Sequence, residues 1–348
     1  MKLSAKKGIF TGIIGILLLV IIILSLNLFS SNKESTDEDG QAGGNTEKLI
    51  LGFSQIGSES AWRTRNTRSI IEAAAENNIK ILYDDAQQKQ SNQLKAIRSF
   101  IVYQVDVIAF VPIVKDGWDN VLQEAKEAGI PVIVVDRQIN ADSSLYAGFL
   151  GENGYLEGKK AGDFMVNKFK NSQKTVNILE ISGTENSSMT LARSNGFRDA
   201  FSDNSFSSNP KFKIIYSESG DFLRSRGKEI MNYIIDDNNG LFYKNQPIDL
   251  IFSHNDSMTL GVLDSFAKHQ ISTNDLVIIS IDAEQQCIDA LVDGKVNCVV
   301  ECNPNLGPTL MSLVKDIADG KEIPRETYMD ENIFTESDDF SKYTARGY

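Results

Sequence analysis

The sequence predicts an α/β protein built from two doubly wound parallel-sheet lobes, and three observations lead to this prediction. The chain has 348 residues, which exceeds one ordinary domain and favours two lobes of about 130 to 150 residues. From Lys48 onward, short apolar runs alternate with longer amphipathic segments, the pattern of strand–helix–strand units in a parallel sheet. Gly or Asn often separates a helix from the next strand, as at Asn78 and Gly129, where a left-handed cap suits these residues.

The elements follow from these runs in chain order. Strand runs are rich in Ile, Val and Leu and are bounded by turn residues, whereas helical segments carry apolar residues on one face. The predicted strands are 49–53, 79–83, 105–111, 131–135, 145–149, 176–181, 213–216, 250–253, 276–281 and 296–300. The predicted helices are 61–77, 90–103, 117–128, 154–169, 189–201, 223–236, 256–268, 285–292 and 305–318. The polar insertions 203–209 and 236–246 are predicted surface loops, and 329–348 an irregular tail.

The first 47 residues differ in kind from the rest. Residues 1–7, a predicted cytoplasmic segment with three lysines, precede 8–29, a predicted transmembrane anchor or signal. Its uncharged stretch 9–29 would span about 32 Å as a helix, enough for a hydrocarbon core of roughly 30 Å. We favour an uncleaved anchor over a cleaved signal, because 27–30 make a poor cleavage site. Residues 30–47 are a predicted disordered linker, and either reading places the folded part outside the cytoplasm.

Charge and cysteine content narrow the partners. The net charge of −12 argues against nucleic acid, which needs a clustered basic surface. Cys287, Cys298 and Cys302 are too few for a disulfide framework, so buried free thiols are favoured, although a pairing of Cys287 stays open. The only histidines, His254 and His269, have no second ligand at zinc spacing. We therefore expect no metal and no cofactor.

One strand-to-helix corner, residues 51–68, predicts a ligand site. Its sequence is LGFSQIGSESAWRTRNTR, in which Ser58 or Ser60 can cap a helix that begins near Ala61. Trp62 and Arg63 then lie in the first helical turn, at the carboxyl end of the strand, where ligands bind in open parallel sheets. The structural alternative is a core aromatic beside a solvated surface charge.

Polar residues stand at the same edge after other predicted strands, and one more lies inside a helix. The candidate ligand-binding residues are Glu59, Trp62, Arg63, Asp136, Arg137, Arg193, Phe222, Asn255 and Asp282. Carboxylates, guanidinium groups and an amide suit a sugar, because each hydroxyl both donates and accepts hydrogen bonds. The aromatic members would cover the apolar C–H face of the ring.

Each candidate also has an ordinary structural interpretation. An Asp after a strand is often only a cap or turn residue, and an Arg beside it can be a surface pair of little value. The corresponding alternatives are a turn role for Asp136 and Asp282, a surface pair for Arg137, a solvated helix charge for Arg193, an N-cap for Asn255, a packed side chain for His254 and a core position for Phe222. The prediction therefore depends on their joint placement.

The sequence gives little support for an enzyme. The sequence contains no G-x-S-x-G elbow, no G-x-x-x-x-G-K-[ST] phosphate loop and no H-E-x-x-H metal helix. A glycosidase, which needs only two carboxylates, stays open on these grounds alone. We expect a binding protein and no enzyme.

From about Lys48 to Thr335 the chain resembles the periplasmic sugar-binding proteins of the ribose-binding type, most closely their galactofuranose-binding branch. The matching segments are GFSQIGSESAWR, DAQQKQSNQLKAIRSF, VDVIAFVPIVKDGW, EAGIPVIVVDR, SGDFLRSRGKE, SHNDSMTLG and SIDAEQQCIDALVDG. The resemblance implies a type I periplasmic binding protein fold, with lobe 1 formed by 48–150 and 302–328 and lobe 2 by 151–301 and 329–348. It implies a three-segment hinge that closes on one monosaccharide.

The resemblance also implies which side chains face the sugar. Glu59, Trp62, Arg63, Asp136 and Arg137 would do so from lobe 1, and Arg193, Phe222, Asn255 and Asp282 from lobe 2. The chain departs from the ribose-type pattern at the crossover near Glu301 and Cys302, where a glutamine is replaced, so we leave that position out.

The implied function is capture of a monosaccharide, such as galactofuranose or a related furanose, by a monomeric extracytoplasmic protein. The implied partners are an ABC permease and its ATPase, and the chain would attach to the membrane through its N-terminal helix. Nucleic acid is not an expected partner. The alternative is a sugar sensor that presents its ligand to a membrane signalling partner. A sugar-responsive repressor would need a DNA-binding headpiece where this chain has a hydrophobic span.

Overall fold

The computed structural model describes residues 48–202, 212–342 and 344–348. The predicted anchor 8–29, the linker 30–47 and the predicted loop 203–209 lie outside the described residues. Within the described ranges, every helix is too short or too polar to cross a bilayer.

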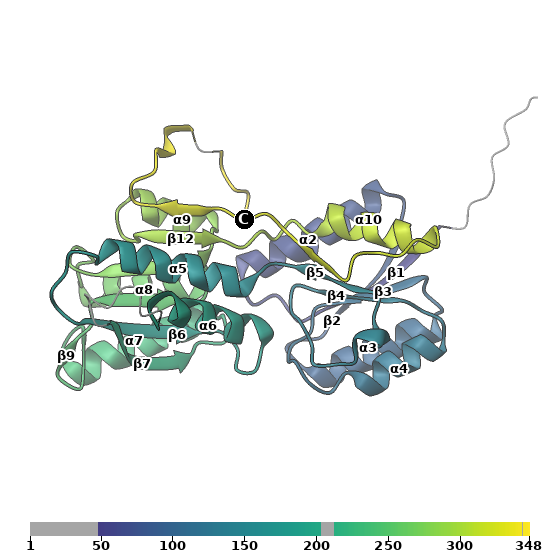
Figure 1. Cartoon of the computed structure of the whole chain (residues 1–348), viewed down its shortest axis with the longest axis horizontal. Coiled ribbons are helices and arrows are strands. Elements are labelled where there is room, and N and C mark those ends of the chain that lie inside the picture. Colours follow the sequence, from purple (N-terminus) through teal and green to yellow (C-terminus); the bar gives the residue numbers. More distant parts are fainter. Residues whose placement is uncertain (1–47, 203–211, 343) are drawn as a thin grey trace, which may run out of the picture. The chain divides into compact units, whose positions relative to one another are not determined.

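One six-stranded sheet organises the first lobe, with strand order β13-β5-β4-β3-β1-β2. All neighbouring strands in it are parallel. Its helices cover both faces, with α3 and α4 on one side and α2 and α10 on the other (Figure 1). The strands are β1 Ile50–Gln55, β2 Lys80–Asp85, β3 Val107–Phe110, β4 Val132–Val135, β5 Gly148–Gly151 and β13 Glu326–Tyr328. The helices are α2 Ala61–Glu76, α3 Gln90–Val102, α4 Asp119–Glu127 and α10 Gly307–Ala318.

A second six-stranded sheet, in the order β14-β12-β11-β10-β6-β7, organises the other lobe. Its neighbouring strands are parallel except for β14, which runs antiparallel to β12. The strands are β6 Val176–Ser182, β7 Phe212–Ser219, β10 Leu250–Ser253, β11 Val277–Asp282, β12 Cys298–Glu301 and β14 Ile333–Thr335. The helices are α5 Gly154–Lys168, α6 Ser188–Ser202, α7 Arg224–Asn238, α8 Asp256–His269 and α9 Gln285–Val292.

Three stretches of chain pass between the two sheets, from β5 to α5, from β12 to α10 and from β13 to β14. This arrangement confirms the predicted fold class of two doubly wound lobes joined by three segments. The exact lobe boundaries remain a prediction. In both sheets the carboxyl ends of the parallel strands lead into the loops and helices that carry the candidate site residues.

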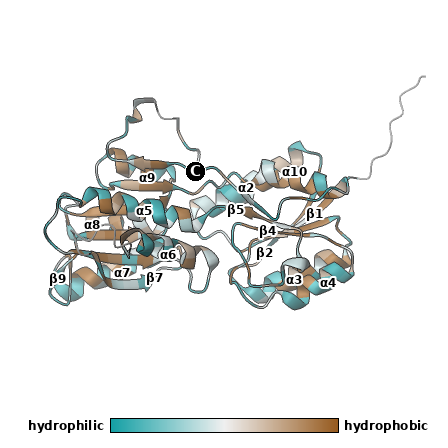
Figure 2. Ribbon diagram, in the orientation of Figure 1, coloured by the Kyte–Doolittle hydropathy of each residue, from teal (hydrophilic) through white to brown (hydrophobic). Residues whose placement is uncertain are grey.

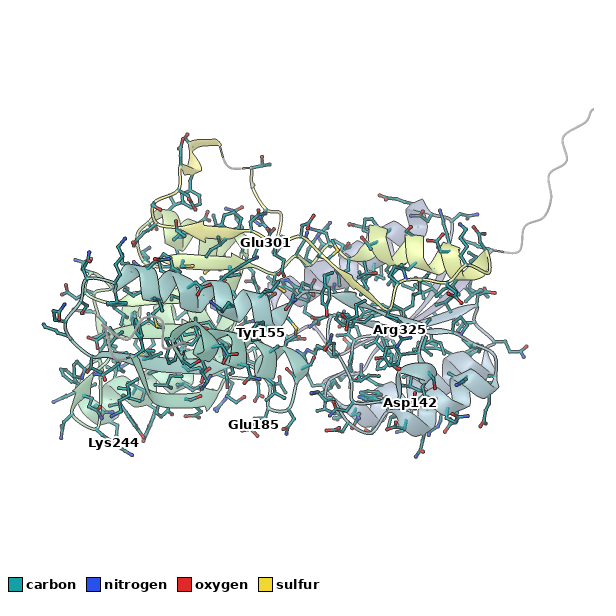
Figure 3. The ribbon with its side chains drawn as sticks, viewed as in Figure 1. Asp142, Tyr155, Glu185, Lys244, Glu301 and Arg325 are labelled. Atoms are coloured by element: carbon teal, nitrogen blue, oxygen red, sulfur yellow. The ribbon has the colours of Figure 1, made fainter. Side chains whose placement is uncertain are left out.

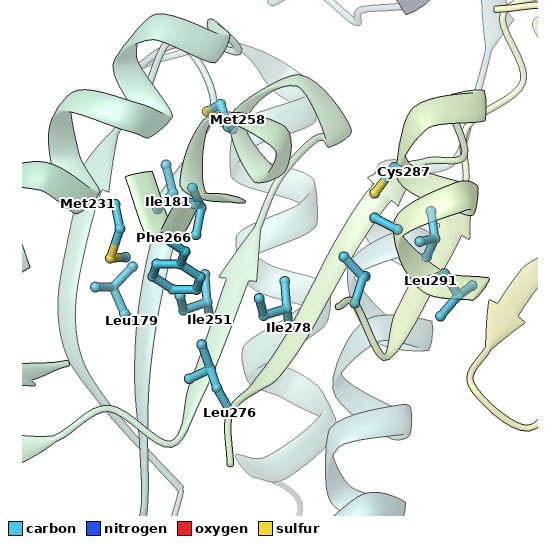
Figure 4. Packing of buried hydrophobic residues seen from close by; sticks show 14 of the residues in the cluster. Leu179, Ile181, Met231, Ile251, Met258, Phe266, Leu276, Ile278, Cys287 and Leu291 are labelled. Carbon is cyan, nitrogen blue, oxygen red and sulfur yellow. The ribbon is translucent and has the colours of Figure 1, made fainter. Parts of the chain in front are cut away.

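Each sheet has an apolar cluster on both faces, as expected for a parallel sheet with helices on either side. In the second lobe, α7, α8 and α9 enclose one cluster, which includes Leu179, Ile251 and Phe266 (Figure 4). The opposite face packs against α5 and α6, where Phe197 stacks on Phe252. In Figure 2 the strands are mostly brown, and teal gathers on the outer helices, so burial follows the predicted periodicity. Cys287, Cys298 and Cys302 are all buried free thiols.

The tail prediction was wrong in part. Residues 333–335 of the segment expected to be irregular form β14, whose backbone pairs with the open edge of β12 and whose Phe334 is buried. A three-residue strand with one inward apolar side chain is too short for alternation to reveal it. The predicted loop 236–246 likewise contains part of a small hairpin, β8 Phe242–Tyr243 with β9 Gln246–Pro247.

The predicted strand 145–149 begins three residues late, at Gly148. Asp142 accepts a hydrogen bond from the Ser144 backbone N–H and starts a short 3₁₀ turn, η1 Ser143–Leu145. Glycine is needed at 148 because β13 approaches closely, and a Cβ there would lie 2.6 Å from the carbonyl oxygen of Pro324.

Candidate functional site

All nine predicted site residues line one cavity of the described chain, at the carboxyl ends of the strands of both sheets. The cavity volume is about 30 Å³, within about 320 Å³ of space between protein atoms that also includes open solvent. The cavity is therefore narrow and can take only a small ligand. Its lining comprises Glu59, Ser60, Trp62, Arg63, Asp136, Arg137, Met189, Arg193, Phe222, Asn255, Asp282 and Cys302.

The first corner positions Arg63. Ser60 is the N-cap of α2 and its hydroxyl accepts a hydrogen bond from the Arg63 backbone N–H at 3.0 Å, which resolves the capping alternative in its favour. The guanidinium donates to Glu59 at 2.9 Å and to Asp136 at 2.6 Å, whereas its buried Nη1 has no partner among the described residues. Burial alone lowers the pKa of Arg63, but the Asp136 and Glu59 carboxylates outweigh it and raise that pKa. The group stays charged and keeps a donor for a ligand.

Trp62 is buried and not solvated, with only 4% of its surface exposed. Its indole Nε1 donates to the carbonyl oxygen of Cys302 at 2.7 Å. The ring packs with apolar residues of the second lobe and also lines the cavity. Trp62 is therefore both a core residue and a residue of the pocket wall. The guanidinium carbon of Arg63 lies 4.7 Å from the centre of its ring.

Arg137 is a buried cation with little compensation inside the protein. Its Nε lies 3.9 Å from the Asp136 carboxylate, and its Nη1 donates to the carbonyl oxygen of Ile113 at 3.3 Å. Burial and the charge of Arg63 lower the pKa of Arg137 to about 10, which still leaves it charged at neutral pH. The surface-pair interpretation is therefore wrong, because both Asp136 and Arg137 are only 3% exposed.

Arg193 brings the corresponding charge from α6. Its Nε donates to Glu157 at 2.6 Å and its Nη1 to the carbonyl oxygen of His254 at 2.6 Å, while Nη2 lies 3.8 Å from Asp282. At 3% exposure it is no solvated helix charge. Burial raises the pKa of Asp282 well above its ordinary value, and Arg193 offsets only part of that effect. An Asp282 carboxyl in this state can donate as well as accept a hydrogen bond.

Phe222 lies between two cations on the cavity wall. The guanidinium carbons of Arg137 and Arg193 lie 5.2 Å and 5.9 Å from the ring centre, within cation–π range. The ring also belongs to the core cluster against α7 to α9, so the core interpretation holds alongside the pocket one. It packs directly over Gly183, where a Cβ would lie 1.9 Å from the ring. Any side chain at 183 would displace the ring.

Asn255 has the structural role that the sequence left open. Its Oδ1 accepts a hydrogen bond from the Met258 backbone N–H at 3.0 Å and caps α8, and its Nδ2 donates to the carbonyl oxygen of Phe222 at 3.3 Å. Asn255 therefore holds Phe222 in place while lining the cavity.

His254 is fully buried and is the packed histidine of the alternative interpretation. Its Nε2 lies 3.2 Å from Glu180, which also accepts two hydrogen bonds from Arg198, at 2.8 and 2.6 Å. Burial would raise the pKa of Glu180, but these partners hold it well below its ordinary value of 4.5. Burial lowers the pKa of His254.

Sequence reasoning missed Glu284, which joins the two lobes. Its Oε1 accepts a hydrogen bond from the Trp62 backbone N–H at 3.0 Å, in the first turn of α2 and 222 positions away in sequence. The carboxylate therefore meets the positive end of the α2 dipole. Glu284 stands two residues after Asp282 and directly before α9, where it looks like an ordinary acid at a helix start. Nothing local signals its distant partner.

At the crossover near 301–302 the two side chains diverge. Glu301 (labelled in Figure 3) accepts a hydrogen bond from Asn332 Nδ2 at 2.6 Å and pairs with Arg346. Cys302 instead lines the cavity. Burial raises the pKa of its thiol well above the ordinary value, so the thiolate that would act as a nucleophile is disfavoured.

The arrangement suits binding of a small polyol. Three buried guanidinium groups, three carboxyl groups and two aromatic side chains surround a cavity that admits only a small molecule. Such planar donors can hold two neighbouring oxygens each, and the carboxyl groups accept from hydroxyls.

Comparison with known proteins agrees with this geometry. The family described as the periplasmic binding protein domain matches residues 51–322. The chain is 38% identical over 307 residues to the galactofuranose-binding protein YtfQ of Escherichia coli strain K12, covering 86% of this chain and 93% of that protein.

Solved structures give the same result. A Mycobacterium smegmatis protein in complex with β-D-fucofuranose is 40% identical, with a TM-score of 0.77 over 83% of this chain and 92% of that one. A galactofuranose-binding protein is 36% identical, with a TM-score of 0.76 over 83% and 95%. The arabinose transporter component of Shewanella sp. ANA-3, bound to L-arabinofuranose, is 34% identical, with a TM-score of 0.76 over 83% and 92%.

Proposed function

The chain belongs to the periplasmic binding protein family, and from this premise we propose that it captures a furanose sugar outside the cytoplasm and delivers it to an ABC transporter. The ligand class is proposed from relatives whose names or bound sugars are galactofuranose, fucofuranose and arabinofuranose. The family is one of binding proteins and not of enzymes.

One observation carries the proposal for this chain itself. Arg63, Arg137 and Arg193 are each 3% exposed and converge on one narrow cavity. Burying three cations around a small space is costly unless a polar ligand completes their hydrogen bonds. A monosaccharide with several adjacent oxygens supplies those acceptors, while Phe222 and Trp62 offer apolar faces for its C–H groups.

The proposed mechanism is closure of the lobes on the sugar. Asp136 and Arg137 would bind from the first lobe, and Arg193 and Asp282 from the second, so a ligand that contacts both favours the closed state. The hydrogen bond from Trp62 N–H to Glu284 joins the lobes next to the cavity and would form only on closure. No bond of the sugar is made or broken.

Calorimetric titration of the detergent-solubilised full chain tests the ligand assignment. Galactofuranose, ribose, galactose and arabinose are compared at one temperature, and a crystal structure of the tightest complex then gives the ring form. We expect one binding site per chain with a furanose ligand. No heat from any pentose or hexose would remove the sugar assignment.

Membrane attachment through the N-terminal segment belongs to the same proposal. The uncharged stretch 9–29 is long enough to span a bilayer, and we propose that it tethers the binding domain to the extracytoplasmic face. Mass spectrometry of protein purified from its own membranes would find the intact chain. A mature chain that begins near residue 30 would instead indicate a cleaved signal.

A further inference from the structure

A second cluster of chemistry-bearing side chains lies where the chain passes between the lobes. Glu157, in the first turn of α5, meets Cys302, just after β12, and Glu331, between β13 and β14. One potential ligand atom from each of the three lies within 4.8 Å of the others. Each of the three residues therefore comes from a different passage between the lobes, or from the helix directly after it. Cys302 lies 145 positions after Glu157 and 29 before Glu331, so no sequence motif indicates this cluster.

A separate observation, a buried carboxylate without hydrogen-bond partners, points to a ligand at this cluster. Glu152, the first residue after β5, is only 2% exposed, yet neither of its carboxylate oxygens has a hydrogen-bond partner in the described chain. Glu157 is fully buried and its Oε1 has no donor partner there, while the Glu331 carboxyl lies within hydrogen-bond reach of Glu157. Buried carboxylate oxygens without partners are rare and costly. Glu152 interacts electrostatically with both Cys302 and Glu331, so its side chain lies near the cluster.

The charges nearby do not balance this group. Arg193 occupies Glu157 Oε2 at 2.6 Å, and the Lys160 ammonium donates to the backbone carbonyl of Glu331 at 3.0 Å. Arg63 also acts on Glu152, but it already donates hydrogen bonds to Glu59 and Asp136. The three carboxyl groups and the thiol therefore share cations that are engaged elsewhere.

We propose that Glu157, Cys302 and Glu331 form a metal site for a divalent transition cation of the zinc type, with Glu152 as an adjacent carboxylate. The donor set decides the class of ion. Ca²⁺ and Mg²⁺ take oxygen ligands only, whereas Zn²⁺ combines cysteine sulfur with carboxylate oxygen. The ligand atoms already lie close enough that small side-chain movements bring them to one ion.

Such a site would link α5 to the two other passages between the lobes. Zinc would then stabilise the folded chain, because it binds atoms that are brought together only on folding. This inference does not depend on the proposed sugar, since none of the metal readouts below requires a sugar.

Titration of ZnCl₂ and CaCl₂ into the metal-stripped full chain in detergent tests the proposal. We expect one zinc ion per chain and calcium binding at least a hundredfold weaker. Glu331→Gln should weaken zinc binding at least tenfold, since even residues behind a metal ligand typically cost about ten- to a hundredfold. Asp330→Asn removes the same charge from the exposed neighbouring side chain and should leave zinc binding unchanged.

Zinc-edge anomalous diffraction from wild-type crystals provides a measurement that needs no variant. The expected peak lies about 2.0 to 2.3 Å from the Glu157, Cys302 and Glu331 ligand atoms. A peak only elsewhere, for example at the exposed carboxylates near His269, overturns the site, as does equal zinc affinity of the wild type and Glu331→Gln. Calcium affinity equal to that of zinc overturns the class of ion.

Discussion

Replacing Arg137 by Met separates ligand binding from folding in this cavity. Met keeps an unbranched side chain of similar reach but removes the charge. Within the protein the substitution removes only a 3.3 Å hydrogen bond from Arg137 to the carbonyl oxygen of Ile113 and a cation–π contact with Phe222 at 5.2 Å. The substitution also removes a buried cation whose nearest carboxylate oxygen is 3.9 Å away. These effects oppose each other, so stability without sugar should change by less than about 1 kcal/mol.

The same substitution should strongly reduce sugar affinity. A charge-assisted hydrogen bond contributes roughly 1.5 to 3 kcal/mol, which corresponds to about tenfold to more than a hundredfold in Kd. Titration calorimetry gives the affinity and urea unfolding gives the stability of the same preparations. Arg98→Met is the matched control, because that arginine is exposed and pairs with Glu124 away from the cavity. Wild-type sugar affinity in Arg137→Met would refute the assigned site. A loss of several kcal/mol of stability would mean that Arg137 is structural.

Three further predictions concern closure, cavity shape and acid stability. Glu284→Ala removes the interlobe hydrogen bond to Trp62, so sugar affinity should fall about tenfold or more, and small-angle scattering with sugar should show a larger radius of gyration than for the wild type. An unchanged radius and affinity would exclude the closure role. Gly183→Ala places a methyl group against the Phe222 ring and should weaken sugar binding more than tenfold by calorimetry, whereas wild-type affinity would show that the ring can move at no cost. Glu180 has a depressed pKa, so its stabilising effect is complete above about pH 4.5 and is lost as pH falls further. The free energy of unfolding in urea should therefore change less between pH 7 and pH 3 for Glu180→Gln than for the wild type. Equal changes in the two proteins would contradict this prediction.

The site was predictable from sequence to the extent that it depends on strand ends. Glu59, Asp136, Asn255 and Asp282 all line one cavity because parallel strands all end at the same edge of their sheet. Arg193 and Phe222 do not immediately follow a predicted strand; they were candidates because of their side-chain chemistry, and the family resemblance also implied them. Their role in binding a sugar remains a prediction.

Other features could not have been read from the sequence. The hydrogen bond between Glu284 and Trp62 joins residues 222 positions apart. The short strand β14 exists because the open edge of β12 offers unpaired backbone groups, not because Ile333–Thr335 has a strong strand pattern. The Arg63 and Arg193 charges could equally have pointed into solvent by their local sequence.

The sequence alone determined the alternation of strands and helices, the two-lobe fold and the edge at which ligands would bind, because periodic burial and turn residues act over a few positions. Only the tertiary structure decided which charged groups are buried, which remain unpartnered and which meet across the passages between lobes. Those outcomes depend on distances between side chains that are far apart in the chain, and electrostatic energies change steeply with such distances and with exclusion of water. The meeting of Glu157, Cys302 and Glu331 belongs entirely to this second kind.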